Sequence, residues 1–146
     1  KSFLDEQGMP LNHIKPHGSL YVMAAKDDNM AHAIADAVET FNVPVFGMAN
    51  TSHEKVYKDE RGLDFIAEFY ADLDYDENGK LVIAKGKNAK YDAKIATDRV
   101  KRALSEKKVT NTVGKDIDVG CDTICVHSDT PNAVEIIKGI KSAINK

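Results

Sequence analysis

Two segments carry the residues best suited to acid–base chemistry. His17 lies in the sequence KPHGSLY, and His127 lies in VHSDTP. Because an imidazole exchanges its proton near neutral pH, either histidine could act as a general acid, a general base or a metal ligand. Gly18 would let the backbone beside His17 approach a ligand closely. Asp129 could either orient the His127 imidazole or cap the helix expected after it.

Other polar residues could bind a substrate or act beside the histidines. Lys15 could hold an anionic group, and the helix start after Thr130 offers backbone N–H groups to an anion. Glu68 and Asp72 follow an apolar segment, where a carboxylate can be a base, a ligand or a loop-forming residue. Each of these residues also has a purely structural interpretation, as a solvated lysine, a loop carboxylate or an N-cap.

Short apolar segments alternate along the chain with amphipathic patterns, which predicts strands alternating with helices. The predicted strands cover residues 13–16, 43–48, 63–70 and 123–126. Helices are predicted from an Asp27 or Asp28 cap to about residue 41, and over residues 52–61, 92–105 and 132–144. Thr130 is the predicted cap of the last helix, and Pro131 its first residue. We expect a hairpin within residues 72–90 and short extended pieces within residues 108–120.

The apolar spacing within the helices predicts which faces are buried. The predicted buried positions are Met30, Ala33, Ile34, Ala37, Val38 and Phe41, then Ile95, Val100 and Leu104, and finally Val134, Ile137, Ile140 and Ile144. His32 and His53 fall within predicted helices, and we expect both at the surface. His13 begins a predicted strand, where we expect a structural role.

Alternating strands and helices predict βαβ units and a parallel sheet. Right-handed crossovers place the carboxyl ends of such strands at one edge, which is where α/β proteins carry their chemistry. The polar residues that follow the predicted strands are Lys15, His17, Ser19, Asn50, Ser52, Glu68, Asp72, His127, Ser128 and Asp129. We therefore expect a site at that edge.

Composition excludes several classes of protein. The 146 residues fit one domain. The net charge of −3 does not indicate a surface that binds nucleic acid. No apolar run is long enough to span a membrane. Cys121 and Cys125 would lie about 13 Å apart on a strand, too far for a disulfide, so we expect reduced thiols in a cytoplasmic protein. The GxGxxG and GxxxxGK[ST] loops are absent, so we do not expect this chain to bind ATP by itself. Lys1–Met9 lacks a signal-peptide pattern. The first residue is not Met, and residues 1–6 have the pattern of the last turns of a helix, so we expect a piece of a longer protein.

Three segments together resemble a known family. They are KPHGSLYVMAAKD (residues 15–27), FIAEFYADLDY with the following GKLV (residues 65–82), and DTICVHSDTPNAVEI (residues 122–136). In this order they resemble the LamB/YcsF family, the A subunits of the ATP-dependent 5-oxoprolinase. The resemblance extends over nearly the whole chain.

The resemblance implies a fold and a reaction. The implied fold is α/β, with residues 1–146 forming a single domain that is the C-terminal portion of a larger (β/α) barrel of the glycoside hydrolase/deacetylase type. The implied reaction opens the lactam ring of 5-oxo-L-proline to L-glutamate, coupled to ATP hydrolysis. B and C subunits are the implied partners and would bind the ATP, and a divalent metal is a further implied cofactor. An incomplete barrel would leave an open strand edge, which favours association, including homo-oligomers.

The resemblance also implies residue roles and shows departures. Catalysis would fall to His17, His127, Asp129 and Asp72, and substrate binding to Lys15, Ser19, Glu68 and Thr130. The family's N-terminal DLGE-like, GFH-like and HP-like motifs are missing, Leu73 stands where members commonly have Arg, and Ser128 where many have Gly. Two alternatives therefore stay open. One is an inactive relative that binds a partner or a small carboxylate, and the other is a metal-dependent deacetylase-like hydrolase.

Overall fold

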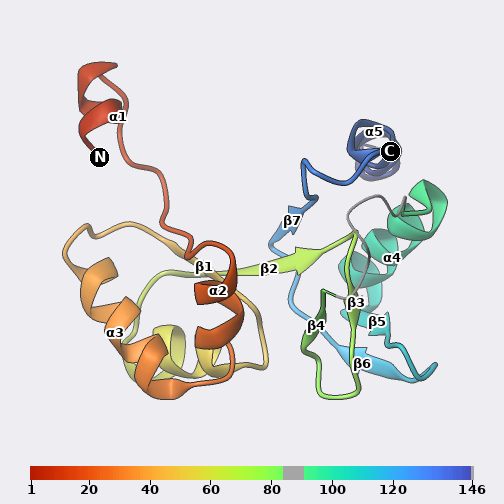
Figure 1. The fold of residues 1–146 in the computed structure, drawn as a ribbon, viewed down its shortest axis with the longest axis horizontal. Coiled ribbons are helices and arrows are strands. Elements are labelled where there is room, and N and C mark those ends of the chain that lie inside the picture. Colours follow the sequence, from red (N-terminus) through yellow and green to blue (C-terminus); the bar gives the residue numbers. More distant parts are fainter. Residues whose placement is uncertain (84–90, 146) are drawn as a thin grey trace. The chain divides into compact units, whose positions relative to one another are not determined.

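Parallel strands alternate with helices in the protein, which confirms the predicted α/β class. A computed structural model describes residues 1–83 and 91–145. The chain divides into two compact units, Lys1–Ala67 (unit one) and Glu68–Lys146 (unit two), which are described separately (Figure 1). A single domain and its place in a larger barrel stay predictions. None of the helices in the described ranges is long and apolar enough to cross a membrane.

Unit one contains four helices and a short parallel strand pair among its described residues. The helices are α1 (Ser2–Glu6), α2 (Ser19–Ala24), α3 (Asp28–Glu39) and the π-helix η1 (Glu54–Glu60). Strand β1 (Val45–Gly47) pairs in parallel with the first half of β2 (Phe65–Tyr70). The strand predicted at residues 13–16 is reduced to one parallel bridge from Ile14 to Val45, because Pro16 has no N–H to extend the ladder. Helix α2 was not predicted.

The core of unit one is built around small side chains on α3. Ala31, Ala35 and Val38 are buried and pack with Val45 of β1 and Val56 of η1. The buried face of α3 is therefore shifted by about one residue from the predicted face. Ala33, Ala37 and Phe41, which were predicted to be buried, are exposed. Alanines carry little hydrophobic signal, but they allow a helix to lie close to its neighbours. Asp27 does cap α3, because its side chain accepts a hydrogen bond from the Met30 N–H at 3.1 Å.

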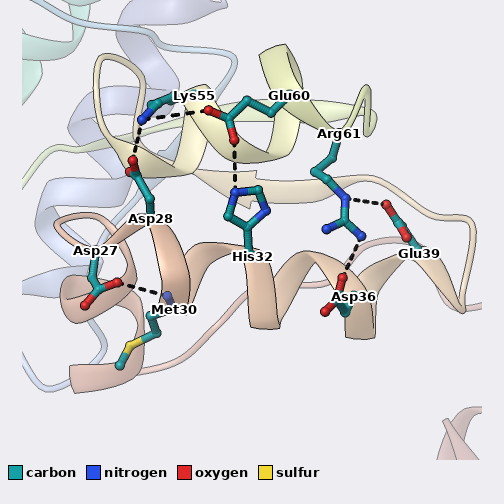
Figure 2. Close-up of polar contacts among 9 residues, drawn as sticks. All are labelled: Asp27, Asp28, Met30, His32, Asp36, Glu39, Lys55, Glu60 and Arg61. Carbon is teal, nitrogen blue, oxygen red and sulfur yellow. Dashed lines mark hydrogen bonds and ion pairs between the residues drawn. The ribbon is translucent and has the colours of Figure 1, made fainter.

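Ion pairs connect the exposed sides of α3 and η1 (Figure 2). Lys55 contacts both Asp28 and Glu60, and His32 lies 3.0 Å from Glu60. At the other end, Arg61 binds Asp36 at 2.6 Å and Glu39 at 2.9 Å, and these two carboxylates hold the pKa of Arg61 well above its usual value. His32 is therefore at the surface, as predicted.

His53 is buried, so its predicted surface position is wrong. Its ring is fully buried and packs in parallel with the Tyr57 ring at 5.2 Å and edge-on to the Tyr21 ring at 4.6 Å. Its Nδ1 accepts a hydrogen bond from the Met48 N–H at 3.1 Å. Gly47 makes room for this ring, because a Cβ at Gly47 would lie 2.8 Å from the Cβ of His53. Burial lowers the pKa of His53 to about 4.

Unit two combines parallel pairing with two hairpins. The second half of β2 pairs in parallel with β7 (Thr123–Cys125). Antiparallel hairpins are formed by β3 (Asp74–Tyr75) with β4 (Leu81–Val82), and by β5 (Lys108–Thr110) with β6 (Asp116–Asp118). The first confirms the hairpin predicted after residue 72, although residues 84–90 of that prediction lie outside the described residues. The second confirms the short extended pieces predicted in residues 108–120, which pair with each other.

Helices α4 (Ala93–Glu106) and α5 (Ala133–Ile144) pack against each other in unit two. Gly139 allows a close approach, because a Cβ there would lie 2.7 Å from Thr97 Oγ1. The buried positions are Ala96, Val100, Ala103, Ala133, Ile136 and Ile140. The predicted faces are therefore wrong for Ile95, Leu104, Val134, Ile137 and Ile144, which are exposed. Both cysteines are free thiols, as predicted.

Acid is expected to destabilise the fold through His53. A histidine in an unfolded chain has a pKa of about 6.5, above the folded value of about 4. The unfolded state therefore binds more protons between these pH values, and stability present above pH 6.5 is lost as the pH falls toward 4, by about 3 kcal/mol. Urea unfolding at pH 7 and pH 4 measures this loss.

Two variants make the test specific to His53. His53→Gln keeps an acceptor for the Met48 N–H but cannot be protonated, so its stability should fall less on acidification. His32→Gln changes a surface histidine on α3 and should retain the acid loss of the unmodified protein. Equal acid losses in the unmodified protein and in His53→Gln would contradict the prediction.

Candidate functional site

Asp72 and His127 come together because their strands are parallel neighbours. In the β2–β7 register Tyr70 is opposite Cys125, and Asp72 and His127 each follow two residues after these strand ends. The pairing extends past the strand ends, since the Ala71 N–H donates to the Cys125 carbonyl at 3.1 Å. Two of the polar residues predicted at a strand edge thus lie side by side.

The Asp72 carboxylate accepts three hydrogen bonds from the segment after β7. Its Oδ1 lies 2.9 Å from Nδ1 of His127. Its Oδ2 accepts from the His127 backbone N–H at 2.8 Å and from the Thr130 hydroxyl at 3.0 Å. The carboxylate therefore fixes both the backbone and the ring of His127.

The Asp72 carboxylate is ionised although it is buried. Its side chain has no exposed surface, whereas the His127 side chain is 37% exposed. Burial alone would raise the pKa of Asp72, but the hydrogen bonds from the His127 ring and backbone outweigh it and hold this pKa below its usual value. A buried charge and a half-exposed imidazole form the centre of the candidate site.

This geometry selects one tautomer of His127. An ionised carboxylate can only accept hydrogen bonds, so Nδ1 of His127 carries the proton it shares with Asp72. In the neutral ring Nε2 is then the basic nitrogen. An aspartate–histidine pair of this kind can take a proton from water and return it to a leaving group.

Tyr70 and Glu68 form the wall next to this pair. The Tyr70 ring packs on the His127 ring at a centroid distance of 5.6 Å and an angle of 24°. Its hydroxyl donates to Glu68 Oε2 at 3.0 Å, and both residues are buried. Sequence reasoning missed Tyr70 because an aromatic residue in a strand is typical of a core. The substrate-binding role predicted for Glu68 stays a prediction.

The other predicted residues of the segment after β7 lie differently. The carboxylate beside the His127 ring is Asp72 rather than Asp129, and Asp129 is exposed, as is Ser128. Helix α5 begins at Ala133 with Asn132 at its N-cap, so the predicted cap at Thr130 and start at Pro131 are wrong. The reason is that the Thr130 hydroxyl binds Asp72.

Lys15, His17 and Ser19 belong to unit one. His17 and Ser19 are exposed, and Ser19 is the first residue of α2. The Lys15 ammonium lies 5.7 Å from the centre of the Tyr21 ring. Gly18 between His17 and Ser19 has φ +63°, the left-handed region that favours glycine. The catalytic and binding roles of these three residues stay predictions.

The described residues do not gather into a metal site. Within residues 1–83 and 91–145, no three His, Cys, Asp or Glu side chains are arranged to hold a metal ion. The divalent metal implied by the resemblance stays a prediction.

The fold is shared with a protein of known crystal structure. The chain superposes on the lactam utilization protein from Thermus thermophilus with a TM-score of 0.82 and 32% sequence identity. The match covers 99% of this chain and 58% of that one. The chain therefore shares its α/β fold with part of a lactam utilization protein.

The family follows from the sequence. The sequence model of the LamB/YcsF family matches residues 1–146, so the chain belongs to that family. It is 40% identical over 147 residues to the A subunit of 5-oxoprolinase from Campylobacter jejuni, covering 99% of this chain and 57% of that protein. It is also 40% identical over 153 residues to the lactam utilization protein lamB of Emericella nidulans, covering 100% and 58%. The chain thus spans a little over half the length of these curated relatives.

Replacing Asp72 should destabilise the protein. Asp72→Asn removes a charge and turns one acceptor oxygen into a donor, which leaves one of the three donors from His127 and Thr130 without an acceptor. We expect the free energy of unfolding to fall by about 1–3 kcal/mol. Asp129→Asn is the matched control, because Asp129 is exposed and its replacement should change this energy by less than about 0.5 kcal/mol. Urea unfolding measures both, and a larger loss for Asp129→Asn would contradict the assignment of Asp72.

Proposed function

We propose that the protein is a lactam hydrolase that opens 5-oxo-L-proline to L-glutamate as the A subunit of a 5-oxoprolinase. The Asp72–His127 pair is the observation that carries this proposal, since it supplies an oriented imidazole beside a buried carboxylate. The relatives are named as the A subunit of 5-oxoprolinase and as a lactam utilization protein, and these names support the choice of substrate.

Opening the ring adds one water across the C–N bond of the lactam. His127 takes a proton from the water as its oxygen attacks the carbonyl carbon. The tetrahedral intermediate then collapses, the C–N bond breaks, and His127 gives the proton to the nitrogen. An amide nitrogen leaves poorly unless it is protonated, so one residue that serves first as base and then as acid suits this reaction.

Asp72 and Thr130 are positioning residues in this proposal. Asp72 stays ionised and stabilises the positive charge that His127 carries between the two proton transfers. The Thr130 hydroxyl holds Oδ2 of Asp72, so the other oxygen remains directed at the ring. The substrate contact predicted for Thr130 is replaced here by support of Asp72.

In this proposal, other subunits of the enzyme couple ring opening to ATP hydrolysis. Neither phosphate-binding loop motif is present in the sequence, so we propose that B and C subunits bind ATP and activate the lactam. Relatives whose names make them one component of 5-oxoprolinase support a multi-subunit enzyme. The free cysteines are consistent with the proposed cytoplasmic location.

Glutamate formation tests the proposal. The purified protein is incubated with 5-oxo-L-proline, ATP and the B and C subunits, and glutamate is measured. His127→Ala should lower kcat by about 10²–10⁴-fold, because it removes the general acid–base group. Asp72→Asn should also lower kcat, while circular dichroism confirms that the variant is folded. His32→Ala changes a surface histidine of α3 and should leave turnover unchanged.

Two results would contradict the proposal. One is a folded, fully assembled preparation that forms no glutamate. The other is turnover by folded His127→Ala at the rate of the unmodified protein, which would remove His127 from the reaction.

A further inference from the structure

A second feature of unit two lies outside the acid–base pair. Arg99 of α4 has a side chain that is only 12% exposed. Its guanidinium lies 5.8 Å from the centre of the Tyr75 ring and 5.6 Å from that of the Tyr91 ring. Nη1 donates to Asp74 Oδ1 at 3.2 Å and also contacts the Tyr91 hydroxyl. One nitrogen of this buried cation is therefore fully engaged.

The other two nitrogens of Arg99 are not engaged. Nε and Nη2 each expose less than 1 Å² and have no hydrogen-bond partner among the described residues. These two atoms form one edge of the guanidinium, with two parallel N–H groups that match the two oxygens of a carboxylate. Buried hydrogen-bond donors are normally paired. The unpaired N–H groups of Arg99 therefore favour binding of an acceptor group at this edge of the guanidinium.

Arg99 lines a pocket of about 350 Å³, a volume typical of a small-ligand site. Asp74, Tyr91, Ile95 and Thr110 are among the other lining residues. Four of the eight lining residues are charged, namely Asp74, Asp98, Arg99 and Arg102, and Ile95 and Val109 are the aliphatic ones. The pocket is therefore suited to a small polar ligand.

The other charged residues of the pocket are already neutralised by neighbours. Arg102 binds Glu106 at 2.8 Å, Thr110 at 2.8 Å, and Asp116 through two nitrogens. Asp98 binds Lys94 at 2.6 Å and Lys101 at 3.5 Å. Of the two arginines that line the pocket, Arg99 is therefore the one whose N–H groups can donate hydrogen bonds to a ligand.

Charge also limits what the pocket can hold. Asp74 already shares the Arg99 guanidinium, so a ligand with a single negative charge is favoured over a dianion. Burial lowers the pKa of Arg99, and the Asp74 and Asp72 carboxylates oppose this, so Arg99 remains a cation at neutral pH.

We propose that Arg99 binds the carboxylate of a small monocarboxylic ligand in this pocket through Nε and Nη2. The proposal deepens the proposed function and rests on it for the choice of ligand, since 5-oxo-L-proline carries one carboxylate. Nε and Nη2 are closed to solvent in this conformation, so side chains around the guanidinium must move before a ligand in the pocket can reach them.

Nuclear magnetic resonance can observe the proposed contact directly. The sequence has three arginines, so Nε–Hε signals are few, and the Arg99 signal is the one that disappears in Arg99→Lys. Titration of the unmodified protein with 5-oxo-L-proline should shift this signal. The neutral lactam 2-pyrrolidinone lacks only the carboxylate and should bind at least about tenfold more weakly. Equal affinities for the two ligands, or an unmoved Arg99 signal at saturation, would overturn the proposal.

Two lysine variants provide a matched comparison by calorimetry. Arg99→Lys keeps the charge but loses the two-pronged edge, so affinity for 5-oxo-L-proline should fall at least about tenfold. Arg102→Lys changes an arginine of the same pocket whose donors are occupied, and affinity should remain within about twofold. If folded Arg99→Lys binds as tightly as the unmodified protein, Arg99 does not hold the carboxylate. If this variant does not fold, Arg61→Lys and Arg102→Lys identify the Arg99 signal by elimination, and the titration of the unmodified protein then decides the question.

Further probes separate this proposal from the proposed function. N-acetylglycine has a carboxylate and an open-chain amide, so a shift of the Arg99 signal with it supports the carboxylate site even when no glutamate is formed. Normal glutamate formation with an unmoved Arg99 signal would overturn the site and leave the proposed function standing. Tighter binding of inorganic phosphate than of 5-oxo-L-proline would overturn the assignment to a carboxylate.

Discussion

The candidate site depends on one buried negative charge. The Asp72 carboxylate has no exposed surface and accepts hydrogen bonds from a ring nitrogen, a backbone N–H and a hydroxyl, all from the segment that follows β7. A buried carboxylate without such donors would be protonated or would disrupt the fold. The same three bonds therefore stabilise the charge, hold the loop after β7 and orient His127.

The two charged sites of unit two differ in how completely they are satisfied. Asp72 has a donor for each of its oxygens, whereas Arg99 has one engaged nitrogen and two without partners among the described residues. A saturated network is rigid and suits a group that must keep its position during proton transfer. An unsaturated cation retains interaction energy for a ligand. The first arrangement is suited to chemistry and the second to recognition.

The sequence predicted the order and type of most elements, because hydrophobic spacing and caps are local signals. Asp27 caps α3 as expected, and Asp72 and His127 meet at a strand edge as the βαβ pattern implied. The buried faces of the helices were harder to predict, because alanines such as Ala96 and Ala103 are buried although they carry a weak hydrophobic signal. The partner of His127 depended on the β2–β7 register, and the burial of His53 on contacts with distant rings, neither of which spacing along the chain reveals.

The two-residue step beyond each strand end makes the site sensitive to chain length. Tyr70 is opposite Cys125, and equal steps along both segments lead to Asp72 and His127. Insertion or deletion of one residue in either step would bring a neighbour such as Ala71 or Leu73 next to His127 in place of Asp72. The turns of the β3–β4 and β5–β6 hairpins lie outside both steps, so a change of length there leaves the acid–base pair in register.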